Sequence, residues 1–141
     1  MNVARAPGVV PASDGAGEVV AVGPHVKHLR EGDRVATLFN QGHQYGALDN
    51  ESIITGLGGS LDGVLREYGV FQEQGLVPLP RGLTFEEGAT QPTLPCAALT
   101  AWNALNGLKG LKPGKCVLVQ GTGGVSVFAL QVSITSGPRF S

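Results

Sequence analysis

The sequence is poor in charge, in cysteine and in long hydrophobic runs. Only 15% of its 141 residues are charged, the net charge is −1 and there is no basic run, so nothing indicates a nucleic-acid-binding protein. Its two cysteines, Cys96 and Cys116, make neither a disulfide framework nor a C-x-x-C motif. No apolar run approaches the ~20 residues of a membrane span, and residues 1–10 lack the apolar core of a secretory signal. We therefore expect a cytoplasmic protein that binds neither nucleic acid nor membrane.

Glycine, in contrast, is abundant. The chain has 22 glycines in 141 residues, about 16%, against the ~7% usual in proteins. The glycines are spread along the sequence, so they predict many tight turns rather than a low-complexity segment.

Hydrophobic residues make up 42% of the chain, which is enough for a core. The length fits one ordinary domain or parts of two.

The most informative stretch is a glycine-rich turn at residues 120–126. Before it, residues 116–119 form a short valine-rich run that predicts a β-strand. After it, apolar residues at helical spacing predict one face of a helix: Val125, Phe128, Ala129 and Val132. A strand, a G-x-G turn and a helix in this order are the context in which a dinucleotide-binding fingerprint has meaning.

Two glycines and the serine of this turn have physical roles in such a fingerprint. Gly121 allows the chain to leave the strand in a tight turn, and Gly123 allows backbone N–H groups to approach a pyrophosphate. The N-terminus of the following helix supplies unpaired N–H donors. Ser126 stands at the third glycine position, where a small residue serves helix–strand packing. The alternative is a glycine turn in an ordinary βα unit that binds no nucleotide.

The first 80 residues predict strands and turns. Four strands are expected, at residues 15–23, 34–39, 64–71 and 76–80. The last of them is expected at a sheet edge, because its prolines cannot donate to a ladder. Residues 40–63 predict a long loop with a short strand or turn around residues 53–54.

From Thr84 onward the pattern becomes helical. Thr84 and Glu87 match a capping box, and Pro92 and Pro95 predict the end of that short helix. A second helix is indicated by small and apolar residues on one face: Ala97, Ala101, Ala104, Leu105 and Leu108. The predicted fold class is therefore mixed α and β, with a β domain at residues 1–93 and the start of an α/β domain at residues 94–141.

Four motifs, in order and spacing, resemble the medium-chain dehydrogenase/reductase superfamily. They lie at residues 13–23, 31–35, 94–102 and 117–125, and they look closest to the zinc-type alcohol dehydrogenase-like and quinone oxidoreductase branches. The resemblance implies an incomplete GroES-like β-barrel followed by the first helix–strand–helix of a Rossmann domain. It also implies NAD(P)-dependent hydride transfer in a cleft between two domains, a small-molecule substrate and a homodimer.

The sequence departs from this family in two ways. By the resemblance, strands are missing before Met1 and most of the nucleotide domain is missing after Gln131, so a chain shortened at both ends is expected. The zinc ligands are mostly missing as well. Ser13 and Asp14 stand where the alcohol dehydrogenases have His-Glu, and Cys96 alone matches a zinc-ligand cysteine. We therefore expect no zinc.

The resemblance assigns cofactor binding to two places. One is Thr100, near the nicotinamide ring, although its hydroxyl could instead bond within its own helical turn. The other is the glycine turn, with Gly121, Thr122, Gly123, Gly124 and Val125. NADP(H) is favoured over NAD(H), because zinc-free members typically reduce enones or quinones with hydride from NADPH. No catalytic residue is assigned.

Two hypotheses about function result. The first is an NAD(P)-dependent oxidoreductase that transfers hydride to or from a carbonyl, enone or quinone without catalytic zinc. The second is a truncated, non-catalytic remnant of such an enzyme, unable to hold the cofactor alone. Nicotinamide binding distinguishes the two.

Overall fold

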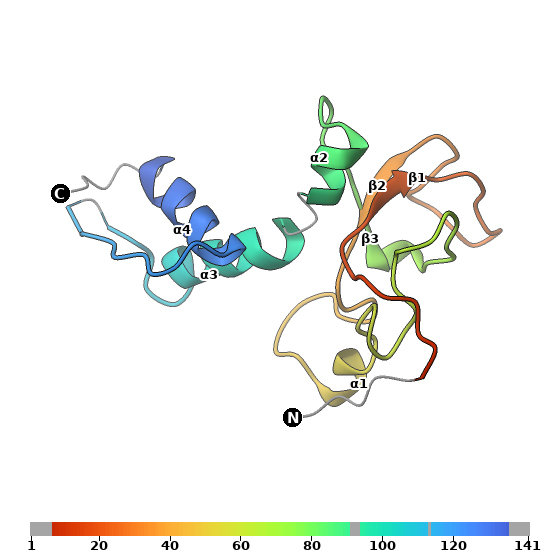
Figure 1. Cartoon of the computed structure of the whole chain (residues 1–141), viewed down its shortest axis with the longest axis horizontal. Helices are drawn as coiled ribbons and strands as arrows, with labels where there is room; N and C mark the ends of the chain where they lie inside the picture. Colours follow the sequence, from red (N-terminus) through yellow and green to blue (C-terminus); the bar gives the residue numbers. More distant parts are fainter. Residues whose placement is uncertain (1–6, 91–93, 113, 136–141) are drawn as a thin grey trace. The chain divides into compact units, whose positions relative to one another are not determined.

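The computed structural model describes residues 7–90, 94–112 and 114–135 (Figure 1). The chain divides into two compact units, Met1–Pro92 and Thr93–Ser141. The three described strands all lie in the first unit. Across the described residues, no helix is both long and apolar enough to cross a membrane.

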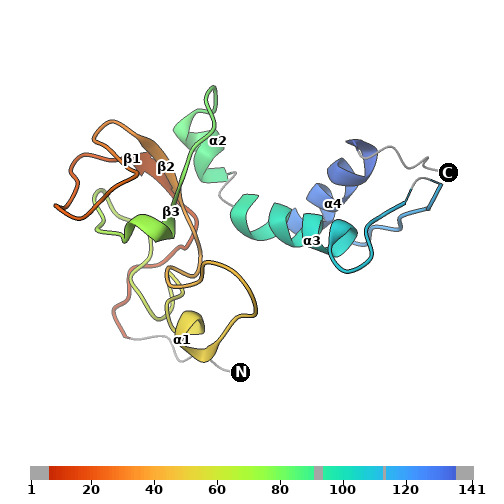
Figure 2. The ribbon, with the colours of Figure 1, turned by 180° about the vertical axis from the view of Figure 1, so that it is seen from behind.

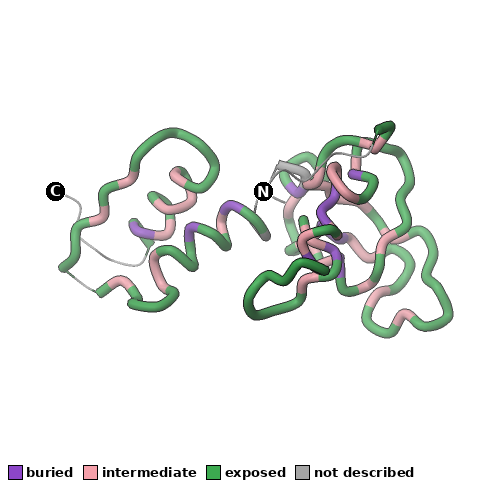
Figure 3. The backbone as a smooth tube through the Cα atoms, turned by 90° about the horizontal axis from the view of Figure 1, so that it is seen from below, coloured by how far each residue is buried: buried purple, intermediate pink, exposed green. Residues whose placement is uncertain are grey.

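The first unit is built on an antiparallel sheet with the strand order β1-β2-β3. The strands are β1 (Ala16–Glu18), β2 (Arg34–Thr37) and β3 (Leu76–Pro78). In the register, Gly17 pairs with Val35 and Ala36 pairs with Val77. The central strand β2 buries its last three residues, whereas Figure 3 shows that most of the chain is exposed or only partly buried. The core is therefore small and centred on β2.

The helix α2 (Phe85–Thr90) packs against β1 and begins as the sequence predicted. The Glu87 N–H donates to Thr84 Oγ1 at 3.1 Å, and the Thr84 N–H donates to Glu87 Oε2 at 2.8 Å. These two bonds confirm the capping box. The Arg34 guanidinium lies 4.2 Å from the centre of the Phe85 ring, and this cation–π contact joins α2 to β2.

The predicted strand at residues 64–71 is wrong, because the structure has loop there. The N–H groups of residues 63–65 do donate to carbonyls of residues 10–12, but three consecutive donors to one neighbour are not the alternating pattern of a β ladder. In addition, Ala12 has a φ of +68°, outside the extended region that a regular ladder needs. The two segments therefore lie side by side without forming a sheet.

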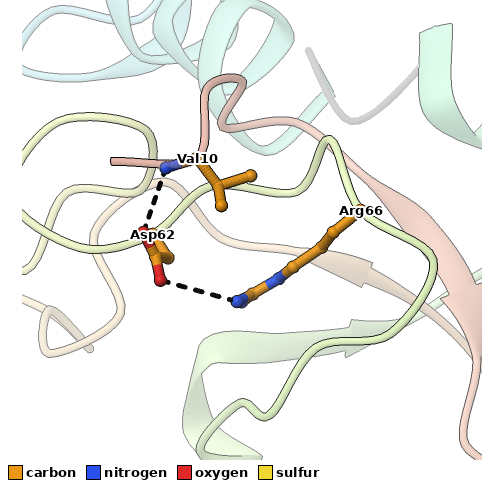
Figure 4. Close-up of polar contacts among 3 residues, drawn as sticks. All are labelled: Val10, Asp62 and Arg66. Atoms are coloured by element: carbon orange, nitrogen blue, oxygen red, sulfur yellow. Dashed lines mark hydrogen bonds and ion pairs between the residues drawn. The ribbon is translucent and has the colours of Figure 1, made fainter. Parts of the chain in front are cut away.

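Asp62 adds a side-chain link between the same two segments (Figure 4). Its Oδ1 accepts from the Val10 N–H at 3.0 Å, and its Oδ2 lies 3.9 Å from the Arg66 guanidinium. Both interactions are at the surface, so each contributes little on its own. Together they mark where the start of the described chain meets the loop around residue 63.

The predicted strand at residues 15–23 is too long, since β1 ends at Glu18. The Val19 N–H donates to the Asp33 carbonyl and the Gly32 N–H donates to the Val19 carbonyl, which closes the base of a loop. The predicted strands at 34–39 and 76–80 are present as the shorter β2 and β3, with β3 at the sheet edge as expected.

Of the short strand or turn predicted around residues 53–54, the turn is present at residues 54–55, and it follows a one-turn helix that was not predicted, α1 (Asn50–Ile53). Asp49 is its N-cap, and its Oδ1 accepts from the Ser52 N–H at 2.7 Å. This hydrogen bond lowers the pKa of the Asp49 carboxyl below its usual value. The cap was not recognised in the sequence, because it is followed by only one turn of helix.

Glu73, at the start of the 3-10 helix η1 (Glu73–Gly75), holds a distant loop. Its Oε1 accepts from the N–H groups of Lys27 at 3.0 Å, of Leu29 at 3.2 Å and of His28. The hydrogen bond from the His28 N–H, the largest cause, lowers the pKa of Glu73.

A pH titration of the loop at residues 27–29 follows from this contact. Since the pKa of Glu73 is lowered on folding, its stabilising effect is present above the unfolded-state pKa and lost as the pH falls through the folded-state pKa. We expect the amide NMR shifts of Lys27, His28 and Leu29 to move together below about pH 4.3, the ordinary pKa of glutamate. Glu73→Gln should abolish this transition, and a transition that persists in Glu73→Gln would show that another group holds the loop.

The regular elements described in the second unit are all helices, and the described residues between α3 and α4 form turns and loops. The π-helix η2 (Leu94–Ala98) runs directly into α3 (Leu99–Asn106), and both pack on α4 (Gly124–Thr135) (Figure 2). The side chain of Ala101 is fully buried and that of Ala97 nearly so, and their small size allows the helices to approach closely. The helices predicted after residue 97 and after the glycine turn are thus present, but α3 ends at Asn106, so Leu108 lies beyond it and is exposed, and Ala104 is exposed as well.

One prediction about this part of the chain is partly confirmed and one is wrong. The short helix α2 ends at Thr90, before the prolines that were predicted to end it, but Pro95 itself lies in the first turn of η2, where its missing N–H is not needed. Pro92 lies outside the described residues. Residues 116–119 belong to none of the strands in the described part of the chain, because a strand requires a ladder and the sheet consists of β1, β2 and β3 alone.

Ser133 is the completely buried residue of α4, and its hydroxyl has no hydrogen-bond partner. Since a buried, unsatisfied hydroxyl costs about 1–3 kcal/mol, Ser133→Ala should raise the stability of the second unit by about 1 kcal/mol. Hydrogen exchange of the α4 amides measures this change. Ser126→Ala is the matched control and should lower protection, because the Ser126 hydroxyl does make a hydrogen bond. Lower protection in Ser133→Ala would contradict the expectation.

Candidate functional site

The glycine turn before α4 has the geometry that the sequence predicted for Gly121. Its φ is +87°, a conformation that residues with a side chain rarely adopt. Space is not limiting, since a Cβ at this position would lie 3.6 Å from Ser126 Oγ, an ordinary contact distance. The backbone conformation is therefore what requires glycine.

Ser126 has a role that was not foreseen from the sequence. Its Oγ donates to the Gln120 carbonyl at 2.7 Å, which ties the residue before the turn to the first turn of α4. A glycine at this position could not form that bond. The serine therefore stabilises the turn by a hydrogen bond, in addition to being small enough for this position.

The N-terminus of α4 leaves backbone donors next to Gly123. The first hydrogen bond of the helix runs from the Val127 N–H to the Gly123 carbonyl at 3.0 Å. The N–H groups of residues 124–126 come before it, and such groups are the usual donors to anions at helix N-termini. A Cβ at Gly123 would meet no atom within 4 Å, whereas a Cβ at Gly124 would lie 3.4 Å from the Ala97 Cβ. Gly123 thus faces open space and Gly124 faces η2.

The remaining predicted cofactor residues lie around this turn or on the neighbouring helix. Thr122 and Val125 are exposed, like the three glycines of the turn. Thr100 lies in the first turn of α3, and its Oγ1 donates to the Cys96 carbonyl at 2.6 Å. Its proton is therefore used in a bond to the preceding turn, in η2, while its oxygen can still accept a hydrogen bond.

The described residues offer little to a metal ion. Cys96 and Cys116 are both exposed. In the part of the chain that the structure describes, no three His, Cys, Asp or Glu side chains are grouped so that they could hold one. A catalytic zinc site normally needs three protein ligands.

The first unit contains an open hollow of about 440 Å³. Its lining comes from the segment before β1, the segment after β2, α1 with the loop before it, and the glycine-rich loop after α1. The lining residues are Ala12, Ser13, Phe39, Asn40, Leu48, Ile53, Gly56, Leu57, Gly58, Gly59 and Ser60. The walls are mainly apolar, with a few polar groups, which is the usual character of a small-molecule site. The size and lining were not predicted, because they come from three separate segments.

The polar edge of this hollow is held by hydrogen bonds. Ser13 Oγ donates to Asp14 Oδ2 at 2.9 Å. Behind them, the buried Thr37 hydroxyl donates to the Ser13 carbonyl at 2.9 Å and accepts from the Gly15 N–H at 3.0 Å. Thr37 thereby fixes the backbone at Ser13, one of the lining residues.

Comparison with known proteins places this geometry in a family. Residues 1–81 match the alcohol dehydrogenase GroES-like domain. Among curated proteins, the chain is 47% identical over 131 residues to a zinc-type alcohol dehydrogenase-like protein of Schizosaccharomyces pombe, covering 92% of this chain and 37% of the relative. It is 34% identical over 136 residues to an alcohol dehydrogenase of Geobacillus stearothermophilus, covering 92% and 39%.

Solved structures give the same result. A candidate alcohol dehydrogenase from Sinorhizobium meliloti 1021 superposes with a TM-score of 0.80 at 41% identity, over 99% of this chain and 41% of that one. A quinone oxidoreductase of Pseudomonas syringae superposes with a TM-score of 0.69 at 28% identity, over 97% and 35%. The chain thus spans about two fifths of the length of these relatives. It belongs to the medium-chain dehydrogenase/reductase superfamily, among the zinc-type alcohol dehydrogenase-like proteins that carry a GroES-like domain.

Proposed function

We propose that this chain contributes to an NAD(P)-dependent oxidoreductase that transfers hydride to or from a carbonyl, enone or quinone without catalytic zinc. The observation that carries the proposal is the open face of Gly123 beside the first N–H groups of α4. A pyrophosphate needs this combination of space and donors. Residues 1–93 would form the GroES-like domain of a homodimer, and residues 94–141 would begin its Rossmann domain.

The chain's own residues would hold the cofactor in two ways. The turn at Gly121, Thr122, Gly123, Gly124 and Val125 would bind the pyrophosphate, and Thr100 Oγ1 would accept from the nicotinamide carboxamide. The nicotinamide, when bound, supplies or accepts the hydride. We propose NADP(H) rather than NAD(H), because the zinc-free members that this chain resembles typically take hydride from NADPH.

The hollow of the first unit would take the substrate. Its apolar walls suit a small organic molecule, and its polar groups would bind a substrate oxygen. The S. pombe relative is named as zinc-type. In the described part of this chain, however, no three potential metal ligands are grouped together, and this supports chemistry without zinc. Where no metal polarises an oxygen, hydrogen-bonding side chains have to do so.

We expect the purified chain to hold no stoichiometric zinc. Cys96 is exposed, and Ser13, which lines the hollow, is hydrogen-bonded to the Asp14 carboxylate, so these side chains are not a set of soft ligands. Elemental analysis after dialysis checks this expectation. One tightly bound zinc per chain that is lost in Cys96→Ala would contradict it.

The alternative is a non-catalytic remnant that cannot hold the cofactor. The observation in its favour is that residues 116–119 belong to no strand in the described part of the chain, although a fingerprint turn normally follows a strand of a parallel sheet. Leu118 is 84% exposed, as expected of a strand without its sheet.

Titration of the purified chain with NADPH and with NADH, followed by calorimetry, separates the two functions. The proposed enzyme predicts saturable binding with NADPH tighter than NADH. Absence of binding at millimolar NADPH would favour the remnant. Equal affinities would leave the oxidoreductase but remove the preference for NADP(H).

A further inference from the structure

The helix α3 ends in an asparagine that is followed by glycine. Asn106 is the last residue of α3, and Gly107 is its C-cap. In the whole sequence, Asn106 is the one asparagine that glycine follows. Glycine has no Cβ, so its backbone nitrogen can approach the side-chain amide of the preceding residue without steric hindrance. This pair is therefore the place in the chain where a backbone nitrogen can most readily attack a side-chain amide.

Two hydrogen bonds hold this pair in the last turn of α3. The Gly107 N–H donates to the Asn103 carbonyl at 2.8 Å, and Asn106 Nδ2 donates to the Trp102 carbonyl at 3.3 Å. The second bond is exposed and longer than is usual for N–H···O bonds. Residues 107–110 are exposed as well, so the end of α3 can open without uncovering a core. Since helix ends open at little cost in free energy, the Gly107 nitrogen and the Asn106 amide are released together.

We infer that Asn106 is a site of spontaneous deamidation. When the turn opens, the Gly107 nitrogen gives its proton to water and attacks Asn106 Cγ. The new bond closes a succinimide ring, the bond from Cγ to Nδ2 breaks, and Nδ2 takes up a proton and leaves as ammonia. Solvent water then opens the ring at either of its two carbonyls, which leaves aspartate or isoaspartate at position 106. Overall, one water is consumed and one ammonia is released, without an oxidant or an enzyme.

The product weakens the end of α3 in two ways. A carboxylate can only accept hydrogen bonds, so the bond to the Trp102 carbonyl is lost. The new negative charge also stands at the C-terminal end of a helix, where the unpaired carbonyls and the helix dipole disfavour it. Since α3 packs on α4, we expect the second unit to become less stable as the chain ages. The inference does not depend on the proposed function.

The test is to age the purified full chain at neutral pH and physiological temperature and to follow each asparagine by peptide mass spectrometry. Asn106 should convert at least about tenfold faster than Asn103, whose neighbour is an alanine inside α3 and is freed only when more of the helix unfolds. Both aspartate and isoaspartate should appear at position 106. Equal rates at the two asparagines, or an Asn106 that keeps its amide throughout, would overturn the inference.

Hydrogen exchange of the α3 amides tests the consequence. Asn106→Asp should lower their protection, and Asn103→Asp should lower it less, because it adds a charge in the same turn but keeps the Asn106 bond to Trp102. Asn106→Gln keeps an amide on a longer side chain that closes the corresponding ring slowly, so its protection should persist during ageing. Unchanged protection in Asn106→Asp, or a loss during ageing that Asn106→Gln does not prevent, would contradict the proposed effect of deamidation.

Discussion

Replacing Gly63 by alanine is expected to destabilise the first unit by about 3–5 kcal/mol, enough to unfold a marginal domain. Gly63 is buried, and a Cβ there would overlap the carbonyl oxygens of Ala12 and Pro11. The atoms that a Cβ would overlap belong to the backbone, not to a flexible side chain. To make room for the Cβ, the two segments would have to separate, and this would break the hydrogen bond from the Gly63 N–H to the Val10 carbonyl.

Urea unfolding of Gly63→Ala beside Gly59→Ala measures this effect. Gly59 lies in the same loop, and a Cβ there would come no closer than 3.9 Å to another atom, the Gly56 carbonyl oxygen. Gly59→Ala should therefore change stability by less than about 1 kcal/mol. If both substitutions had the same small effect, the close approach of residues 10–12 to Gly63 would be absent in solution.

Gly123→Val is expected to weaken NADPH binding at least tenfold, which corresponds to about 1.4 kcal/mol. A branched side chain would fill the open face beside the N–H groups of residues 124–126, where the pyrophosphate is proposed to lie. The fold should tolerate the change, because a Cβ at Gly123 meets no atom within 4 Å.

The same substitution at Gly110 is the control for this experiment. Gly110 lies in the loop after α3, where a Cβ would come no closer than 3.9 Å to the Asn106 carbonyl oxygen. Gly110→Val should keep the affinity of the unmodified chain. An unchanged NADPH affinity in a folded Gly123→Val protein would place the pyrophosphate elsewhere.

The parts of the fold with local causes could be predicted from the sequence. The capping box of Thr84 and Glu87 predicted α2, and the prolines predicted an edge position for β3. The prediction of a strand at 64–71 was wrong because Ala12, which is far away in the sequence but lies beside this segment, has a left-handed conformation that prevents a regular ladder. Alternation of residues within a segment does not reveal the backbone of its neighbour.

In the candidate site, too, the features with local causes could be predicted and those with distant causes could not. The tight turn at Gly121 could be predicted, since its positive φ is set by the backbone within a few residues. The Ser126 bond to Gln120 could have been suggested by a serine in the first turn of a helix, a position where side chains often bond to nearby backbone. The hollow around Ser13 could not, because its lining joins residues 12–13, 39–40 and 48–60.

The most direct test of the central claim is to map NADPH on the ¹⁵N-labelled chain by amide chemical shifts. The proposed site predicts saturable shifts concentrated at residues 121–126, with smaller changes at Thr100. Shifts that are confined to other residues, or an unchanged spectrum at millimolar NADPH, would contradict the assignment of this turn as the nicotinamide dinucleotide site.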